Sequence, residues 1–167
     1  MREKTSITGV VSEATAPSSL AFAGGNWILA NANTYSGTTT LTSGNVTLSN
    51  AGALGTGTLA VTGGMVLAGS AGPTTITNGV NLFGNLTFTG TANPLTLTGN
   101  ITASAARSFI ALGNQTNVIN NIVSNATISN AIAITFGGTG NLLVAGDLLG
   151  GGSTTQNSVV VSNSSGG

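Results

Sequence analysis

The sequence predicts an all-β chain folded as a right-handed parallel β-helix, with about six or seven coils of roughly 19 to 24 residues each. Three observations lead to this prediction: a glycine-led segment recurs along the chain, short stretches alternate apolar and polar residues, and helix-favouring charged residues are scarce. Of the 167 residues, 26 are glycine and only 4% are charged. A soluble domain usually carries about 25% charged residues, so Thr, Ser and Asn must provide the polar surface here.

The recurring segment is the strongest of these observations. Residues 25–32, 44–51 and 63–70 share the order Gly, Asn or Gly, apolar, any residue, Leu, small, with a period of about 19. In a solenoid each segment stacks on its own repeat, whereas a sandwich gives distant segments no reason to be alike. Leu29, Leu48 and Leu67 are therefore expected to form one inward stack.

Alternation within the repeats predicts half-buried strands, because apolar residues every second position share one face. Trp27 takes the position that Val46 and Met65 hold in the later repeats, so it is expected inside. The predicted core positions of the repeats are Trp27, Leu29, Val46, Leu48, Met65, Leu67, Leu86 and Phe88. Gly, Asn and Ser mark the bends between strands. The repeat does not fix the coil boundaries in residues 103–133.

The chain divides into two parts. Residues 1–19 hold Pro17 and four of the six charged residues, a composition that suits an N-terminal arm or cap on a solenoid end. Residues 20–167 are expected to form the β-helix. The last residues show no capping signal, so we expect the solenoid to continue or to stack on another chain beyond Gly167.

The turn and strand motifs of the first half resemble a known repeat. Asn33-Thr34-Tyr35-Ser36-Gly37 opens a Thr-rich strand, and the segment 44–59 adds a glycine-led strand and the turn Gly-Ala-Leu-Gly-Thr-Gly. This order resembles the autotransporter-associated β-strand repeat over roughly residues 25–69, and the second half has no further Asn-Thr-Tyr-Ser-Gly. The resemblance implies a parallel β-helix of a type V secreted or large bacterial surface protein. It implies an extracellular, adhesive or stalk-like element and no catalytic residues.

Several function classes are disfavoured by composition. Three basic residues leave no patch for a nucleic-acid backbone, and no apolar run reaches the length of a membrane-spanning helix. The chain has no histidine, and Asp147 and Arg107 are the only charged residues after residue 13. We expect both to be surface charges and the protein not to be an enzyme. No aspartates accompany the Gly-Gly segments as calcium ligands, so we expect neither a metal nor a cofactor.

Two functions remain open. The first is a non-enzymatic structural or adhesive element at the bacterial cell surface, which self-associates end to end through exposed strand edges. The second is a binding module with a flat Thr- and Asn-rich face for carbohydrate, such as a host or surface glycan, or for ice. The candidate residues of that face are Thr47, Thr87, Thr89, Thr96 and Thr98. Threonine ladders also arise simply because Thr favours strands and provides uncharged polar cover.

Overall fold

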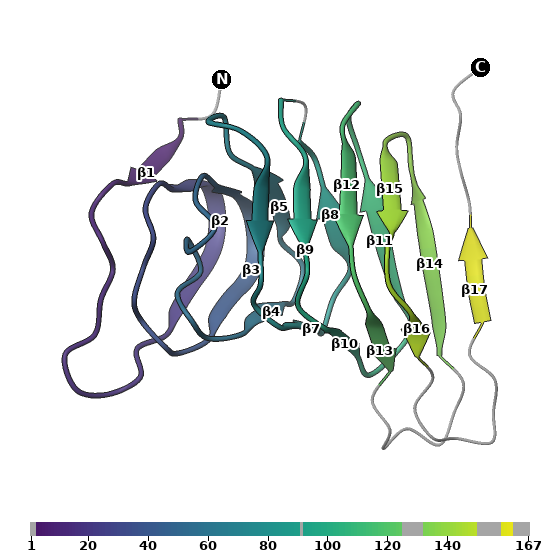
Figure 1. The fold of residues 1–167 in the computed structure, drawn as a ribbon, viewed down its shortest axis with the longest axis horizontal. Helices are drawn as coiled ribbons and strands as arrows, with labels where there is room; N and C mark the ends of the chain where they lie inside the picture. Colours follow the sequence, from purple (N-terminus) through teal and green to yellow (C-terminus); the bar gives the residue numbers. More distant parts are fainter. Residues whose placement is uncertain (1–2, 91, 125–131, 150–157, 162–167) are drawn as a thin grey trace.

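The computed structural model describes residues 3–90, 92–124, 132–149 and 158–161. They form a parallel β-solenoid of about six turns, which confirms the predicted parallel β-helix. The strands follow one another along the long axis of the molecule, from β1 at one end to β17 at the other (Figure 1). All regular secondary structure within the described residues is β-strand. This part of the chain contains no helix that could span a membrane.

The strands lie on three faces around a common interior. One sheet of 13 strands folds over at β3 into a first and a second face, and a separate sheet of four strands makes the third. The first face contains β4 (Leu59–Val61), β7 (Val80–Leu82), β10 (Ile101–Ala103), β13 (Ile122–Ser124) and β16 (Leu148–Leu149). The second contains β1 (Thr5–Ile7), β5 (Met65–Ala68), β8 (Leu86–Phe88), β11 (Arg107–Ala111), β14 (Ala133–Gly138) and β17 (Ser158–Val161). The third contains β6 (Thr74–Ile76), β9 (Leu95–Leu97), β12 (Thr116–Ile119) and β15 (Asn141–Val144).

Two long strands, β2 (Leu20–Leu29) and β3 (Thr39–Leu48), bend from the first face onto the second. Glycine makes the bend, since Gly24, Gly25 and Gly44 have φ values of 86°, 76° and 86°. The stacked bends also approach closely: a Cβ on Gly44 would lie 2.5 Å from the carbonyl oxygen of Gly25. Only glycine fits this corner without strain.

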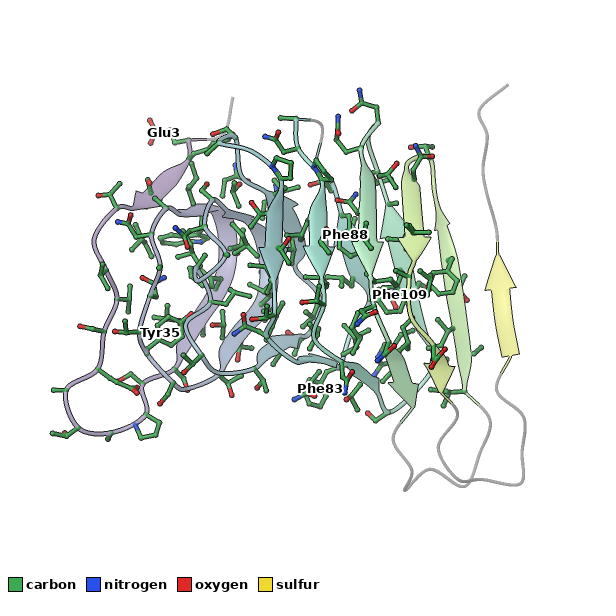
Figure 2. The ribbon with its side chains drawn as sticks, viewed as in Figure 1. Glu3, Tyr35, Phe83, Phe88 and Phe109 are labelled. Carbon is green, nitrogen blue, oxygen red and sulfur yellow. The ribbon has the colours of Figure 1, made fainter. Side chains whose placement is uncertain are left out.

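Side chains that point inward stack from coil to coil. On the second face Trp27, Val46, Val66 and Phe88 are in register, and the last three are at most 1% exposed. Further along, the rings of Phe109 and Phe136 stack with centroids 5.5 Å apart. Figure 2 shows Phe88 and Phe109 lying between the faces. The interior is thus a continuous apolar column rather than a set of separate cores.

The Asn-Thr-Tyr-Ser-Gly segment ties neighbouring coils together. Asn33 is 6% exposed; its Oδ1 accepts a hydrogen bond from the Val11 amide at 2.8 Å, and its Nδ2 donates to the Ala53 carbonyl at 2.6 Å. One side chain therefore contacts the coil on either side of it. Tyr35 of the same segment is fully buried.

Residues 5–19 are part of the stack. β1 pairs in parallel with β2, and the Val11 carbonyl accepts a hydrogen bond from the Thr34 amide at 3.0 Å. The Glu13 carboxylate accepts hydrogen bonds from the Ser36 hydroxyl at 2.5 Å and from the Ser18 amide at 2.6 Å. The segment is thus a partial first coil, and its action as a cap stays a prediction.

The register corrects one sequence expectation. The structure pairs Val46 with Val66 and Leu48 with Ala68, one position away from the pairing of Val46 with Met65 and of Leu48 with Leu67. The cause is an added residue between Leu48 and Gly52: Leu48 pairs with Leu29, 19 positions earlier, while Gly52 lies over Ala32 and Gly57 over Gly37, each 20 positions earlier. The turn between Gly52 and Gly55 holds Leu54, which is 1% exposed and fills the interior.

Coils also lengthen toward the C-terminal end. The first-face register advances by 19 residues from Leu20 to Thr39, by 21 from Ile101 to Ile122 and by 26 from Ile122 to Leu148. The added residues lie in the connections between faces, so strands stay in register while the sequence period drifts. Of the stretch 103–133, whose boundaries the repeat left open, residues 125–131 lie outside the described residues.

Candidate functional site

Most of the core residues predicted from the repeats lie inside the apolar column, whereas Trp27 lies at its margin and Leu67 points outward. Leu29, Val46, Leu48, Leu86 and Phe88 are all at most 1% exposed. Trp27 is half-buried against the column. Its ring is tilted by 57° to the ring of Phe22, with centroids 5.7 Å apart, and its Nε1 donates to the Gly24 carbonyl at 2.7 Å. Leu67 is only partly buried, and pairs with the outward Thr47. Met65 pairs with Asn45 in the backbone register, and its side chain is outside the described part.

The five candidate threonines do not form one array. Thr47 and Thr87 belong to the second face and Thr89 directly follows β8 there, whereas Thr96 belongs to the third face and Thr98 follows β9 at a corner. On the second face Thr47 has Ile28 and Leu67 as register neighbours, and Thr87 has Met65 and Ile110. The expectation of a flat threonine face is therefore wrong. Outward positions are not constrained by the core, so the residues of successive coils differ there.

Two of these threonines line a shallow groove on the second face. Thr47 and Thr89 lie there with Leu67 and Ile28, around a volume of about 150 Å³. Lys4 from the N-terminal segment also reaches it.

Arg107 and Asp147 lie at different corners. Arg107 opens β11, where the chain passes from the first face to the second, and its Nε and Nη1 donate to the carbonyls of Leu82 and Ala106 at 3.2 and 2.8 Å. Asp147 is exposed and directly precedes β16, where the chain passes from the third face to the first. Its backbone amide donates to Asn121 Oδ1 at 3.0 Å. The first face separates the two residues, so they do not form a pair.

Among the described residues no three His, Cys, Asp or Glu side chains gather as metal ligands. Arg107 uses its guanidinium to hold backbone carbonyls at a corner, which is a structural use of the charge. The other described charges belong to the N-terminal segment.

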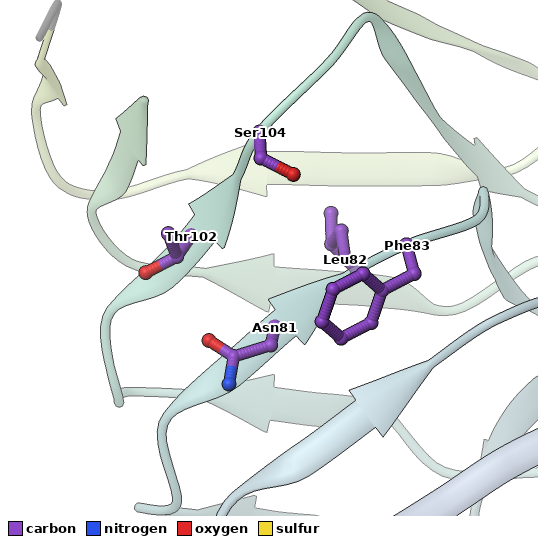
Figure 3. A pocket seen from close by; sticks show the side chains of 5 residues that line it. All are labelled: Asn81, Leu82, Phe83, Thr102 and Ser104. Atoms are coloured by element: carbon purple, nitrogen blue, oxygen red, sulfur yellow. The ribbon is translucent and has the colours of Figure 1, made fainter. Parts of the chain in front are cut away.

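A hollow on the first face combines an exposed ring with polar groups. Asn81 on β7 and Thr102 on β10 are register neighbours, and Phe83 and Ser104 follow the same two strands. With Leu82 they surround a volume of about 230 Å³. Figure 3 shows the Phe83 ring beside the Asn81 side chain, with Thr102 and Ser104 on the adjoining coil.

Sequence reasoning missed this hollow, although a signal was present. Asn81 and Leu82 alternate outward and inward, so the next residue must point outward, and that residue is the aromatic Phe83. An outward Phe after an inward Leu departs from the half-buried pattern. The other residues of the hollow come from the next coil, and only the register shows which they are.

No family model matches this chain, and neither a curated protein nor a solved structure is significantly similar to it.

Proposed function

We propose that this protein is a non-enzymatic structural and adhesive element of a bacterial surface protein, acting outside the cell. The observation that carries the proposal is the unbroken parallel sheet, which runs through successive coils from β1 to β17. In such a solenoid each coil contacts only its neighbours, and the fold extends in one direction as a rod. A rod of this kind suits a stalk that holds a contact surface away from its anchor.

The scarcity of charge supports the non-enzymatic part of the proposal. Catalysis of glycosidic or acyl chemistry needs positioned acids, bases or nucleophile–base pairs. The described residues offer Arg107 and Asp147 at separate corners and otherwise only the N-terminal charges. The resemblance of residues 25–69 to the autotransporter-associated repeat supports the extracellular location.

Self-association through the strand edges is part of the same proposal. Within the described residues β1 pairs only with β2, and β17 only with β14. A strand with one free edge can pair with a strand of another molecule through backbone hydrogen bonds. Parallel stacking of two such ends would continue the rod without a change in its geometry.

Location is tested on cells that produce the protein. Intact cells are treated with an external protease, and this chain is followed by immunoblot beside a cytosolic marker. We expect the chain to be cleaved while the marker stays intact. Protection of both proteins until the cells are lysed would contradict the surface location.

Assembly is tested on the purified full chain by sedimentation velocity over a hundredfold concentration range, with electron microscopy of the same samples. Species that grow with concentration and appear as rods along one axis are the expected result. A monomer at all concentrations would refute end-to-end assembly and leave the stalk role to a single chain.

A further inference from the structure

We infer that the hollow around Phe83 is a binding site for a neutral saccharide. This inference rests on the adhesive part of the proposed function and names its ligand class. Phe83 is 58% exposed, whereas Phe22, Phe88 and Phe109 are at most 4% exposed. Figure 2 shows Phe83 at the outer edge of the molecule, away from the buried rings. Among the described residues Phe83 is the only aromatic residue that is exposed rather than buried or half-buried.

The backbone prevents Phe83 from turning inward. The amides of Phe83 and Gly84 both donate to the Val61 carbonyl, each at 2.8 Å. Gly84 is packed so closely on the previous coil that a Cβ there would lie 2.1 Å from the Thr62 carbonyl oxygen. The chain is therefore fixed on both sides of the aromatic position, and the ring is held on the outside before any ligand arrives. Such preorganisation lowers the entropy cost of binding.

The polar groups beside the ring are free to bind. Within the described residues, the side chains of Asn81, Thr102 and Ser104 have no hydrogen-bond partner, and none of the three is buried. Many corner residues of similar type use their side chains along the stack: Thr62 and Thr98 donate to Leu41 and Ile76 carbonyls, and Asn78 to Gly55 and Gly57 carbonyls. The hollow thus offers one amide and two hydroxyls as donors and acceptors.

This combination matches the chemistry of a sugar ring. The C–H face of a pyranose is apolar and packs against an aromatic ring, while its hydroxyls need donors and acceptors at the rim. The lining carries no charge, which favours a neutral sugar over an acidic one. The volume of about 230 Å³ is below the roughly 300–1,000 Å³ of drug-sized pockets and suits one ring of a larger polymer.

A protein partner fits the hollow less well. Standard protein interfaces bury about 800 Å² on each side with an apolar centre. Five residues, three of which are polar, do not provide such a centre. We therefore assign the saccharide as the ligand, and binding of a second copy is an outcome that the experiment detects.

The test is affinity electrophoresis of the full chain in native gels containing a soluble β-glucan, a mannan or a galactan, with polyanionic alginate as a fourth matrix. We expect retardation in at least one neutral polysaccharide. Phe83→Ala should weaken that binding about tenfold, as for a central aromatic contact, and Asn81→Ala should weaken it as well. Leu143→Ala is the matched control, because Leu143 is 52% exposed on the third face; it should bind like the natural chain.

Circular dichroism melts establish that each variant is folded, which we expect since Phe83 makes little contact with the core. Three results would overturn the inference: no retardation by any neutral polysaccharide, retardation unchanged in Phe83→Ala, or a concentration-dependent dimer of the natural chain that Phe83→Ala abolishes. Each of them leaves the protease test of surface location unaffected, so failure here is distinguishable from failure of the proposed function.

Discussion

The phenol oxygen of Tyr35 and the hydroxyl oxygen of Thr39 lie 2.5 Å apart inside the solenoid, where both residues are 0% exposed. Each group satisfies the hydrogen-bonding need of the other in a region that water does not reach. The pair joins the turn before β3 to the first residue of that strand. It is a polar contact within the first coils of a mostly apolar column.

We expect Tyr35→Phe to lower the free energy of unfolding by about 1–3 kcal/mol, because it leaves the buried Thr39 hydroxyl without this partner. Thr39→Val should have a similar effect on the phenol. The double variant removes both polar groups and should lose less than the sum of the two single changes. Urea unfolding followed by circular dichroism measures all three; strictly additive losses would show that the pair is not coupled.

Alkaline pH should destabilise the fold through the same residue. Burial raises the pKa of the Tyr35 phenol, with the hydrogen bond to Thr39 acting in the opposite direction. The unfolded chain therefore releases this proton first as the pH rises, so stability is full below about pH 10 and falls above it. The chain has a single tyrosine, which makes tyrosinate absorbance specific to this site. Melting temperature should drop more steeply with pH in the natural chain than in Tyr35→Phe, and equal slopes would contradict the prediction.

Acid should loosen the N-terminal segment. The hydrogen bond from the Ser36 side chain is the largest of the contacts that lower the pKa of the Glu13 carboxyl, and the Ser18 amide adds to it. The stability from these contacts is present above the ordinary Glu pKa of about 4.3 and is lost as the pH falls below it. Glu13→Gln should reduce the hydrogen-exchange protection of the Ser18 amide at neutral pH. Glu3→Gln, in the same segment, is the control and should leave that protection unchanged.

The register between β3 and β5 predicts unequal losses of stability for the same substitution at two neighbouring residues. Val66 is 1% exposed and points inward, so Val66→Thr places a hydroxyl in the column at a cost of about 1–3 kcal/mol. Leu67 points outward, and Leu67→Thr should cost clearly less, since the new hydroxyl reaches water. Chemical denaturation of the two variants decides the register; a larger loss for Leu67→Thr would favour the pairing of Leu48 with Leu67 that the repeat alone suggested.

The general architecture could be predicted because the geometry of a solenoid requires a similar residue pattern in every coil. Val46 and Leu48 alternate with outward residues, and the glycines before them mark the bend, so strand, face and repeat follow from local patterns. Stacking requires inward apolar residues and bends at the same places in each coil, and this requirement appears as a period in the sequence. For this reason the sequence could predict that Leu29, Leu48, Leu86 and Phe88 point inward.

The tertiary structure alone decided which residues meet. A single added residue between Leu48 and Gly52 moved Leu67 out of the column and brought Val66 into it, because a shift of one position reverses the side of the strand. The outward positions follow no core constraint, so the threonines dispersed over two faces and a corner. Likewise, Phe83 and Thr102 share one hollow only because coils of 21 residues place β10 beside β7, with Ile101 next to Val80. The sequence by itself determined that the chain forms stacked coils, because burial selects inward apolar residues in every repeat in the same way. The exact lengths of the connections around each turn determined which outward residues lie side by side on the surface, and only the tertiary structure shows those lengths.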